Sequence, residues 1–400
     1  MFRLLQGDVG SGKTILALIA SANVIEAKFQ VAFMSPTEVL SQQHYNLAKK
    51  LFSSSNVKME HLTGKTDYQN KKKINSNLKN GSINLIFGTH SLFQKKVEFN
   101  KLGLIVIDEQ HKFGVKQRLN LAKKGGDDCD VLLMSATPIP RTMMLSIFGD
   151  MDISRLKEKP KNRKEIKTLI KPESKTSEII PLIKKKISKN KQIFWICPLI
   201  NESGKLNYAS VENKFEFIKN IFPDNVGLLH GKLNPEQRDL VLNKFLKKEI
   251  KILVSTTVVE VGVDFPNANV IVIENANKFG LSQLHQLRGR VGRGEDESVC
   301  ILLYKDRLSE NAKKRLKTLR STNDGFVIAD EDLNIRGPGD ILGFQQSGIK
   351  NFKFADPIHH KSLFFLAEKN LINLEKKNIK KFETLLKLHD KAEIIKELIV

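Results

Sequence analysis

The sequence GDVGSGKT, which runs from Gly7 to Thr14, stands between a short apolar stretch and the run ILALIASANVIEA. This order predicts a strand, a glycine-rich turn and a helix start, with the spacing G-x-x-x-x-G-K-[ST] of a phosphate-binding loop. In such a loop, backbone N–H groups and the helix dipole bind phosphate groups, and Lys13 reaches the β- and γ-phosphates. The alternative is a glycine-rich loop without a ligand. We expect a nucleoside triphosphate to bind at Gly7, Gly10, Ser11, Gly12, Lys13 and Thr14.

Two adjacent carboxylates, Asp108 and Glu109, follow the apolar run LGLIVI in the stretch LGLIVIDEQHKFG. Paired negative charge at the tip of a buried strand is costly unless a cation compensates for it. Together with the phosphate loop, the pair indicates that Asp108 and the Thr14 hydroxyl hold Mg²⁺. Glu109 is then expected to orient and deprotonate the attacking water, and His111 to lie near the γ-phosphate. Without a phosphate loop, such a pair is more typical of a helix start.

Three other apolar stretches run directly into small or hydroxyl residues: VAFMSPTEVL, NLIFGTHSLF and VLLMSATPIPRT. Each predicts a buried strand whose polar residues lie at its carboxyl end, the edge where open parallel sheets bind ligands. A plain turn is the alternative for each stretch. We expect the hydroxyl groups to connect the carboxylate pair with a bound nucleic-acid strand, through Thr37, Thr89, Ser135 and Thr137.

The second half of the chain repeats the alternation of strands and helices, from IKTLI near residue 166 to SVCILLY near residue 298. This alternation predicts an α/β fold with two parallel sheets in series. Between them, GDMDISRLKEKPKNRKEIK loses apolar periodicity and gains charge, which is typical of a linker. The expected division is a first domain over 1–150, a linker over 151–170, a second domain over 171–320 and a C-terminal region over 321–400.

The run HQLRGRVGRG, residues 285–294, places Arg290 and Arg293 three positions apart. On a helix, this spacing puts both guanidinium groups on one face. Opposite a nucleotide held by the first domain, they would act as a pair of arginine fingers that stabilise the transition state. A basic surface helix without a ligand is the alternative.

Composition and charge limit the classes of protein to which this chain can belong. The chain of 400 residues has 40% hydrophobic and 28% charged residues, which is ordinary for a globular protein, and its apolar runs are too short for a membrane span. With no signal peptide before the phosphate loop and three distant cysteines, we expect a cytoplasmic protein without a disulfide framework or metal cluster. The formal charge of +22 indicates a polyanionic partner such as nucleic acid, with a solvated lysine surface as the alternative.

The motif order GDVGSGKT, SPTE, GTH, DEQH, SATP, TTVVEVGVD and QLRGRVGR resembles the superfamily two helicases over residues 3 to about 305. The resemblance implies a motor of two RecA-like domains, of the phosphate-loop nucleotide hydrolase class, that uses ATP and Mg²⁺. It also implies that Gln286 joins the two arginines in the catalytic set. Gly262 and Asp264 are implied to contact the nucleotide, and Thr256 to couple the site to DNA.

The segment LNIRGPGDILGFQQSG, residues 333–348, is similar to a segment associated with translocation on double-stranded DNA. That segment occurs in the RecG family and in the transcription-repair coupling factors, and WICPLINES and SATPIPRT look more like the RecG family. The resemblance implies that a helical hairpin precedes Arg336. It also implies that Arg336 and Gln346 relay domain movement to a hook that grips duplex DNA. Residues 351–400 show the periodicity of C-terminal helices.

The RecG-family resemblance implies an ATP-dependent DNA helicase or translocase that acts on branched DNA in recombination and repair. The implied reactions are replication fork reversal and Holliday junction branch migration. Expected partners are duplex and branched DNA, bound without sequence preference, and single-stranded-DNA-binding protein. The expected state is a monomer.

Two alternatives stay open: a translocase like the transcription-repair coupling factor, and a catalytically silent DNA-binding remnant of a helicase. Members of the RecG family carry an N-terminal wedge domain of OB type and an adenine-reading segment before the phosphate loop. Here Met1 stands six residues before Gly7. We therefore expect a motor with weak ATPase chemistry, poor adenine selectivity and no fork specificity.

Overall fold

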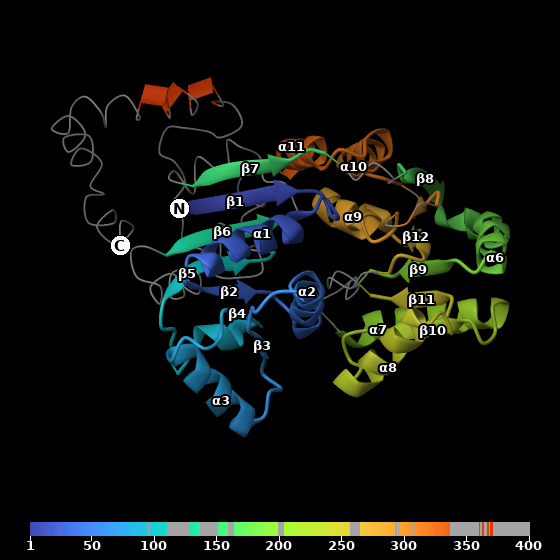
Figure 1. Ribbon diagram of the computed structural model, residues 1–400. Helices are drawn as coiled ribbons and strands as arrows, with labels where there is room; N and C mark the ends of the chain where they lie inside the picture. Colours follow the sequence, from blue (N-terminus) through green and yellow to red (C-terminus); the bar gives the residue numbers. More distant parts are fainter. Residues whose placement is uncertain are drawn as a thin grey trace.

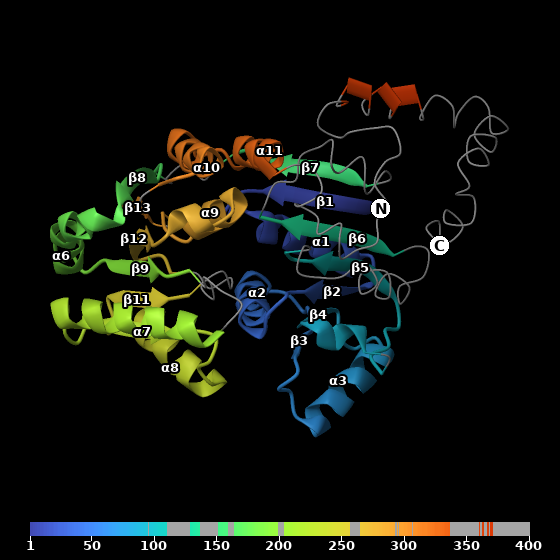
Figure 2. The same ribbon diagram turned by 180° about the vertical axis from the view of Figure 1, so that it is seen from behind.

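The computed structural model describes most of the first 336 residues and a few residues beyond them. The described residues are 1–94, 96–109, 129–136, 151–158, 164–198, 204–256, 265–292, 294, 296–305, 307–336, 360, 362–363, 366–367 and 369–370. They form two lobes, each with a parallel sheet and helices packed on it (Figures 1 and 2). None of the helices in these ranges has both the length and the apolar character needed to cross a membrane.

The sheet of the first lobe has the strand order β3-β4-β2-β5-β6-β1-β7. Its strands are β1 (Phe2–Gly7), β2 (Gln30–Met34), β3 (Met59–Leu62), β4 (Leu85–Gly88), β5 (Leu102–Ile107), β6 (Asp130–Ser135) and β7 (Asp152–Leu156). The helical segments described here are α1 (Lys13–Glu26), α2 (Glu38–Leu51), α3 (Tyr68–Lys79) and the 3-10 helix η1 (His90–Phe93). Strand β2 is buried throughout, because its apolar side chains contribute to a core on each face of the sheet.

The sheet of the second lobe has the strand order β10-β11-β9-β12-β13-β8. Its strands are β8 (Lys167–Pro172), β9 (Gln192–Ile196), β10 (Val226–Leu229), β11 (Ile252–Ser255), β12 (Ala268–Ile273) and β13 (Val299–Tyr304). The helical segments described here are η3 (Glu173–Ile179), α6 (Ile180–Ser188), α7 (Gly204–Ile221), α8 (Pro235–Leu246), η5 (Ala276–Lys278), α9 (Leu281–Arg288), α10 (Glu310–Ser321) and α11 (Gly325–Arg336).

Several helices begin at side chains that cap them. The Thr37 hydroxyl accepts a hydrogen bond from the backbone N–H of Leu40 at 3.3 Å, where α2 begins. Helix α8 begins with a capping box in which the side chains of Asn234 and Gln237 each accept from the other's backbone N–H. Such caps satisfy backbone N–H groups that have no partner within the helix. They therefore determine where the chain turns from a strand end into a helix.

The predicted fold of two parallel sheets in series is confirmed. Two edge strands were not predicted, β3 and β7, because their side chains are mostly only half-buried or exposed and their apolar pattern is weak. The stretch expected to be a linker supplies β7 to the first sheet and most of β8 to the second. Most of the C-terminal stretch 351–400, for which helices were expected, lies outside the described residues.

The two lobes are in contact where the strands of the first sheet end. In Figure 1, β1 points toward the second lobe, and α2 lies between the sheets. Val39 of α2 packs against the hydrophobic core of the second lobe. The guanidinium carbon of Arg155, in β7, lies 5.4 Å from the centre of the Phe326 ring in α11. The functional groups at the end of the first sheet therefore face residues of the second lobe.

Candidate active site

The turn between β1 and α1 has the backbone of a phosphate-binding loop. Gly10 and Gly12 have φ angles of 78° and 91°, in the left-handed region that favours glycine. A Cβ atom on Gly7 would lie 2.4 Å from the Ser11 hydroxyl oxygen, so this position also excludes a side chain. A Cβ atom on Gly12 would meet nothing within 4 Å. The loop therefore has an open side at the amino terminus of α1, where a helix favours negative charge.

Lys13 lies over this loop with its ammonium group turned inward. Its Nζ donates hydrogen bonds to the backbone oxygens of Gly7 at 2.7 Å and Asp8 at 2.9 Å. The Ser11 hydroxyl is buried and has no hydrogen-bond partner. Phosphate oxygens are acceptors that suit both groups, so the residues present fit the predicted triphosphate.

The carboxylate pair lies at the end of β5, as predicted. Asp108 is buried, and its Oδ1 accepts a hydrogen bond from the backbone N–H of Glu109 at 2.9 Å. Glu109 has a φ angle of 50°, a strained value for a residue with a side chain. Carboxylate and hydroxyl oxygens are the ligands that Mg²⁺ prefers, so Asp108 with Thr14 at the start of α1 suits the predicted metal.

Charged groups from both lobes shift the pKa of Glu109. Burial and the neighbouring Asp108 carboxylate raise the pKa of Glu109 to about 7, while Lys13 and Arg290 act in the opposite direction. Arg290 belongs to the second lobe and is itself buried. A carboxyl group with a pKa near 7 can take up a proton at neutral pH. The structure thus brings together Lys13, the carboxylate pair and Arg290.

The prediction that Arg290 lies on a helix, on the same face as Arg293, is wrong, because Arg290 is not in a helix. Helix α9 ends at Arg288, and Gly289 caps it, so Arg290 lies in the turn that follows. A Cβ atom on Gly289 would lie 3.2 Å from the Cβ of Val9 in the phosphate loop. The end of α9 therefore packs against the phosphate loop, and Arg290 follows directly after this contact. Arg293 lies outside the described residues.

The other predicted residues lie at several places in the chain. Thr37 uses its hydroxyl to cap α2, and Thr89 precedes η1 without capping it. Ser135 is buried at the end of β6, Thr256 is buried after β11 with an unpaired hydroxyl, and Gln286 is half-buried on α9. Arg336 is the last residue of α11. The remaining residues lie outside the described part of the chain: His111, Thr137, Gly262, Asp264 and Gln346.

Sequence reasoning missed His44, which contacts the carboxylate pair. His44 projects from α2, and its Nε2 lies 2.9 Å from Oδ2 of Asp108. Both side chains are buried, and the His44 ring lies 5.0 Å from that of Phe33. With Oδ1 bonded to the next backbone N–H, both carboxylate oxygens are oriented by the first lobe, and each keeps lone pairs for a cation. The sequence SQQHYNL contained no signal for this pairing.

A His44→Ala variant is expected to need more Mg²⁺ for ATP hydrolysis. Groups that orient a metal-binding side chain contribute roughly 10- to 100-fold in metal affinity, so we expect about a tenfold rise in the Mg²⁺ concentration that gives half the maximal rate. A Mg²⁺ titration of the ATPase rate measures it. His61→Ala is the matched control, because His61 also contacts α2 but at the Ser41 hydroxyl, at 3.0 Å. Equal titration curves for wild type and His44→Ala would contradict this role.

Three regions of the chain match known protein families. Residues 3–145 match the DEAD/DEAH box helicase family, and residues 174–295 match the helicase conserved C-terminal domain. Residues 322–382 match the C-terminal part of domain 3 of the ATP-dependent DNA helicase RecG. This last match favours the RecG family over the transcription-repair coupling factors.

The curated relatives that the chain matches are also RecG helicases. The chain is 48% identical to the ATP-dependent DNA helicase RecG of Thermotoga maritima over 89% of this chain and 46% of the relative. It is 46% identical to RecG of Bacillus subtilis over 94% of this chain and 55% of the relative. The chain thus spans about half the length of the curated relatives it matches.

Solved structures extend the comparison. A structure of RecG bound to a three-way DNA junction covers 90% of this chain, with a TM-score of 0.74 and 43% identity, while the match spans 47% of that protein. Yeast Dbp5 bound to RNA and ADP BeF3 has a TM-score of 0.57 at 17% identity, which shows the shared fold alone. By its motifs, its two lobes and these relatives, this chain is a homologue of RecG and belongs to the family of ATP-dependent DNA helicases.

Proposed function

We propose that this chain is an ATP-driven motor that moves along double-stranded DNA and remodels branched DNA, by fork reversal and Holliday junction branch migration. The observation that carries the proposal is that the phosphate loop with Lys13 lies against the end of α9 in the second lobe, so that Lys13 and the buried Arg290 are both near Glu109. Hydrolysis that needs both lobes is coupled to their closing and opening. Likeness to the RecG structure bound to a three-way DNA junction supports branched DNA as the substrate.

In the proposed cycle, the loop N–H groups and Lys13 bind the phosphates of ATP. Glu109 orients the attacking water and accepts its proton, for which a pKa of about 7 is well suited. Mg²⁺ held by Thr14 and Asp108 would offset part of the phosphate charge.

Arg290 is proposed to stabilise the charge that develops on the transferred phosphoryl group, with Arg293 as a second finger. Gln286 lies on α9, before the turn that holds Arg290, and completes the proposed catalytic set. Because Arg290 comes from the second lobe, loss of the γ-phosphate removes a group that holds the lobes together. Hydrolysis then favours their separation.

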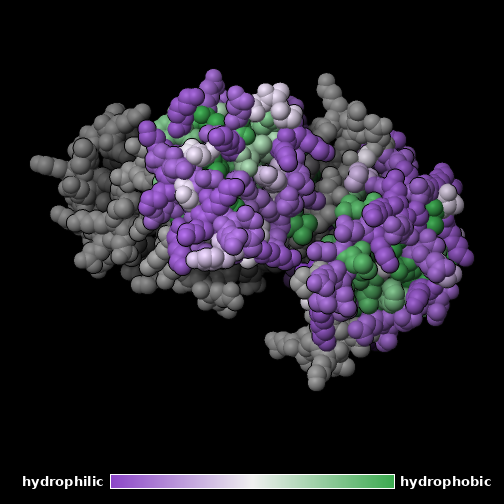
Figure 3. All heavy atoms as spheres, turned by 60° about the horizontal axis from the view of Figure 1, so that its bottom comes forward, coloured by the Kyte–Doolittle hydropathy of each residue, from purple (hydrophilic) through white to green (hydrophobic). Residues whose placement is uncertain are grey.

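The surface supports a nucleic-acid partner. The formal charge is +22, and one face of the described surface is hydrophilic over most of its area (Figure 3). On α3, Tyr68 is 79% exposed, and Lys72 and Lys73 are exposed on the same helix. Basic groups bind the phosphate backbone without reading its sequence, and an exposed aromatic ring can stack on a base.

Steady-state ATPase rates test the proposal. The rate is measured without DNA, with linear duplex and with a three-way junction, for wild type and Lys13→Ala. We expect DNA to stimulate the wild type, and Lys13→Ala to lose roughly 10²- to 10³-fold of the stimulated rate, because the lysine charge acts directly on the phosphates.

Two outcomes would contradict the proposal. Equal rates in wild type and Lys13→Ala would favour a catalytically silent DNA-binding protein. A wild-type rate that no DNA raises would exclude a DNA-driven motor. The ratio of the junction rate to the duplex rate separately tests the expectation of no fork specificity, and a ratio well above one would contradict that expectation.

A further inference from the structure

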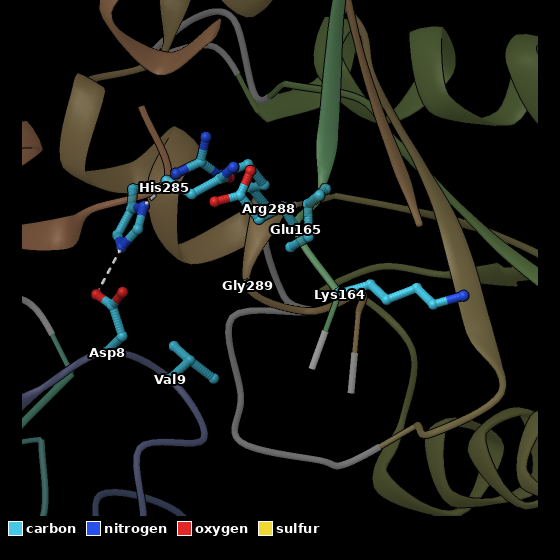
Figure 4. A pocket seen from close by; sticks show the side chains of 9 residues that line it. Asp8, Val9, Lys164, Glu165, His285, Arg288 and Gly289 are labelled. Carbon is cyan, nitrogen blue, oxygen red and sulfur yellow. Dashed lines mark hydrogen bonds and ion pairs between the residues drawn. The ribbon is translucent and has the colours of Figure 1, made fainter. Parts of the chain in front are cut away.

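Asp8 in the phosphate loop and His285 in α9 form a buried contact between the two lobes. Oδ1 of Asp8 lies 3.1 Å from Nε2 of His285, and the two side chains are 15% and 9% exposed. Figure 4 shows Asp8 projecting from the phosphate loop toward the His285 ring. The contact borders a pocket lined by residues of both lobes, among them Val9 and Gly289. The expected catalytic residues include neither Asp8 nor His285.

Arg288 determines which nitrogen of His285 carries the proton. Nη2 of Arg288 lies 3.0 Å from Nδ1 of His285. Because a guanidinium group can only donate hydrogen bonds, Nδ1 must accept, and Nε2 carries the proton that is donated to Asp8. The other guanidinium nitrogen, Nη1, donates to the backbone oxygens of Leu319 at 2.6 Å and Thr322 at 2.9 Å. A continuous hydrogen-bonded path thus joins the phosphate loop to the carboxyl end of α10.

Helix α11 begins directly against this path. A Cβ atom on Gly325, the first residue of α11, would lie 2.0 Å from Oδ1 of Asp8 and 2.8 Å from Nε2 of His285. Further along, Oδ2 of Asp332 accepts a hydrogen bond from the Ser282 hydroxyl of α9 at 2.6 Å. Helix α11 is therefore bonded to α9 of the second lobe at Asp332, and its first residue lies against Asp8 of the phosphate loop. Its other end is Arg336, where the sequence RGPGDILGFQQSG begins.

We propose that Asp8, His285 and Arg288, called here the interdomain link, position α11 when the two lobes close on ATP. Asp8 moves with the first lobe, and His285, Arg288 and α11 move with the second, so opening of the cleft breaks the link at the Asp8–His285 contact. The three are positioning residues, since they act through α11 on the segment that follows Arg336. The inference rests on the proposed function, because its consequence is coupling between ATP hydrolysis and DNA.

Two substitutions of His285 distinguish the loss of its hydrogen bonds from the loss of its side-chain packing. Glutamine keeps one donor for Asp8 and one acceptor for Arg288, whereas leucine keeps neither. The readout is the ATPase rate with duplex DNA divided by the rate without DNA. Coupling between distant sites is typically 5- to 150-fold, so we expect His285→Leu to lower this ratio about tenfold. His285→Gln should keep the ratio within about twofold of wild type, and both variants should keep the rate without DNA within about twofold.

Gly325→Ala tests the link from the side of α11. A Cβ atom here would displace both Oδ1 of Asp8 and the His285 ring, so the Asp8–His285 contact should be lost. The stimulation ratio should fall as in His285→Leu. Asp8→Ala combined with His285→Leu should be no worse than either single change, since both remove one contact.

Several results would overturn the interdomain link. The proposal fails if His285→Leu has the same stimulation ratio as the wild type. It also fails if the stimulation ratio of His285→Gln is no higher than that of His285→Leu. Equal losses in the rates with and without DNA would instead assign these residues to the hydrolysis site. If DNA does not stimulate the ATPase rate of the wild type, both the proposed function and the interdomain link are wrong. This result can be distinguished from the others because it is seen in the wild type.

Discussion

Arg290→Ala is expected to lower the DNA-stimulated kcat for ATP hydrolysis by roughly 10³-fold, because an arginine finger contributes about 10³ to 10⁵ to phosphoryl transfer. Arg290 is buried in the turn after α9 and acts electrostatically on Glu109 of the opposite lobe. The effect should be largest on kcat, since the guanidinium group acts on charge that develops during the reaction. A steady-state ATPase assay at saturating ATP measures it.

Arg290→Lys and Arg320→Ala are the informative controls. Lysine keeps the charge but lacks the planar set of donors, so it should recover only part of the rate. Arg320 is exposed on α10, so its loss should leave kcat near wild type. An Arg290→Ala variant with kcat within a few-fold of wild type would contradict both the finger role and the two-lobe site.

Glu109→Gln is expected to lower kcat by roughly 10²- to 10⁴-fold with little change in the KM for ATP, because it removes the general base and keeps the size of the side chain. Burial and the Asp108 carboxylate raise the pKa of Glu109 to about 7, which suits the proposed role of this side chain as proton acceptor. Single-turnover hydrolysis with a separate measurement of ATP binding distinguishes the two effects.

Glu98→Gln is a suitable comparison, since Glu98 forms an exposed ion pair with Lys79 at 2.7 Å, in the same lobe. It should leave both parameters near wild type, because exposed ion pairs contribute little. If Glu109→Gln instead weakened ATP binding and left kcat intact, Glu109 would be a binding residue rather than the base.

Features that depend on neighbours in the sequence could be predicted. The glycines of GDVGSGKT have the positive φ angles that only glycine adopts easily, and the apolar run LGLIVI forms a buried strand that ends at Asp108. Both follow from backbone sterics and from the period of the side chains along a strand. The two parallel sheets follow from the repeated alternation of such units, and the family resemblance adds the order of the motifs.

Features that depend on distant residues could not be predicted. His44 and Asp108 are 64 residues apart, and Asp8 and His285 are 277 residues apart. Neither pair has a local pattern, because the contact depends on which strands become neighbours and on how the two lobes close. The sequence also suggested a single helix face for Arg290 and Arg293, whereas α9 ends at Arg288 and Arg290 lies in the turn after it.

The phosphate loop, the carboxylate pair and the two parallel sheets could thus be predicted from the order of the residues, since they arise from local backbone preferences and side-chain periodicity. The electrostatic effect of Arg290 on Glu109, and the connection of the lobes through Asp8, His285 and Arg288, became visible only in the folded chain. These contacts form between side chains from separate lobes, and their energy depends on burial and distance in the folded arrangement.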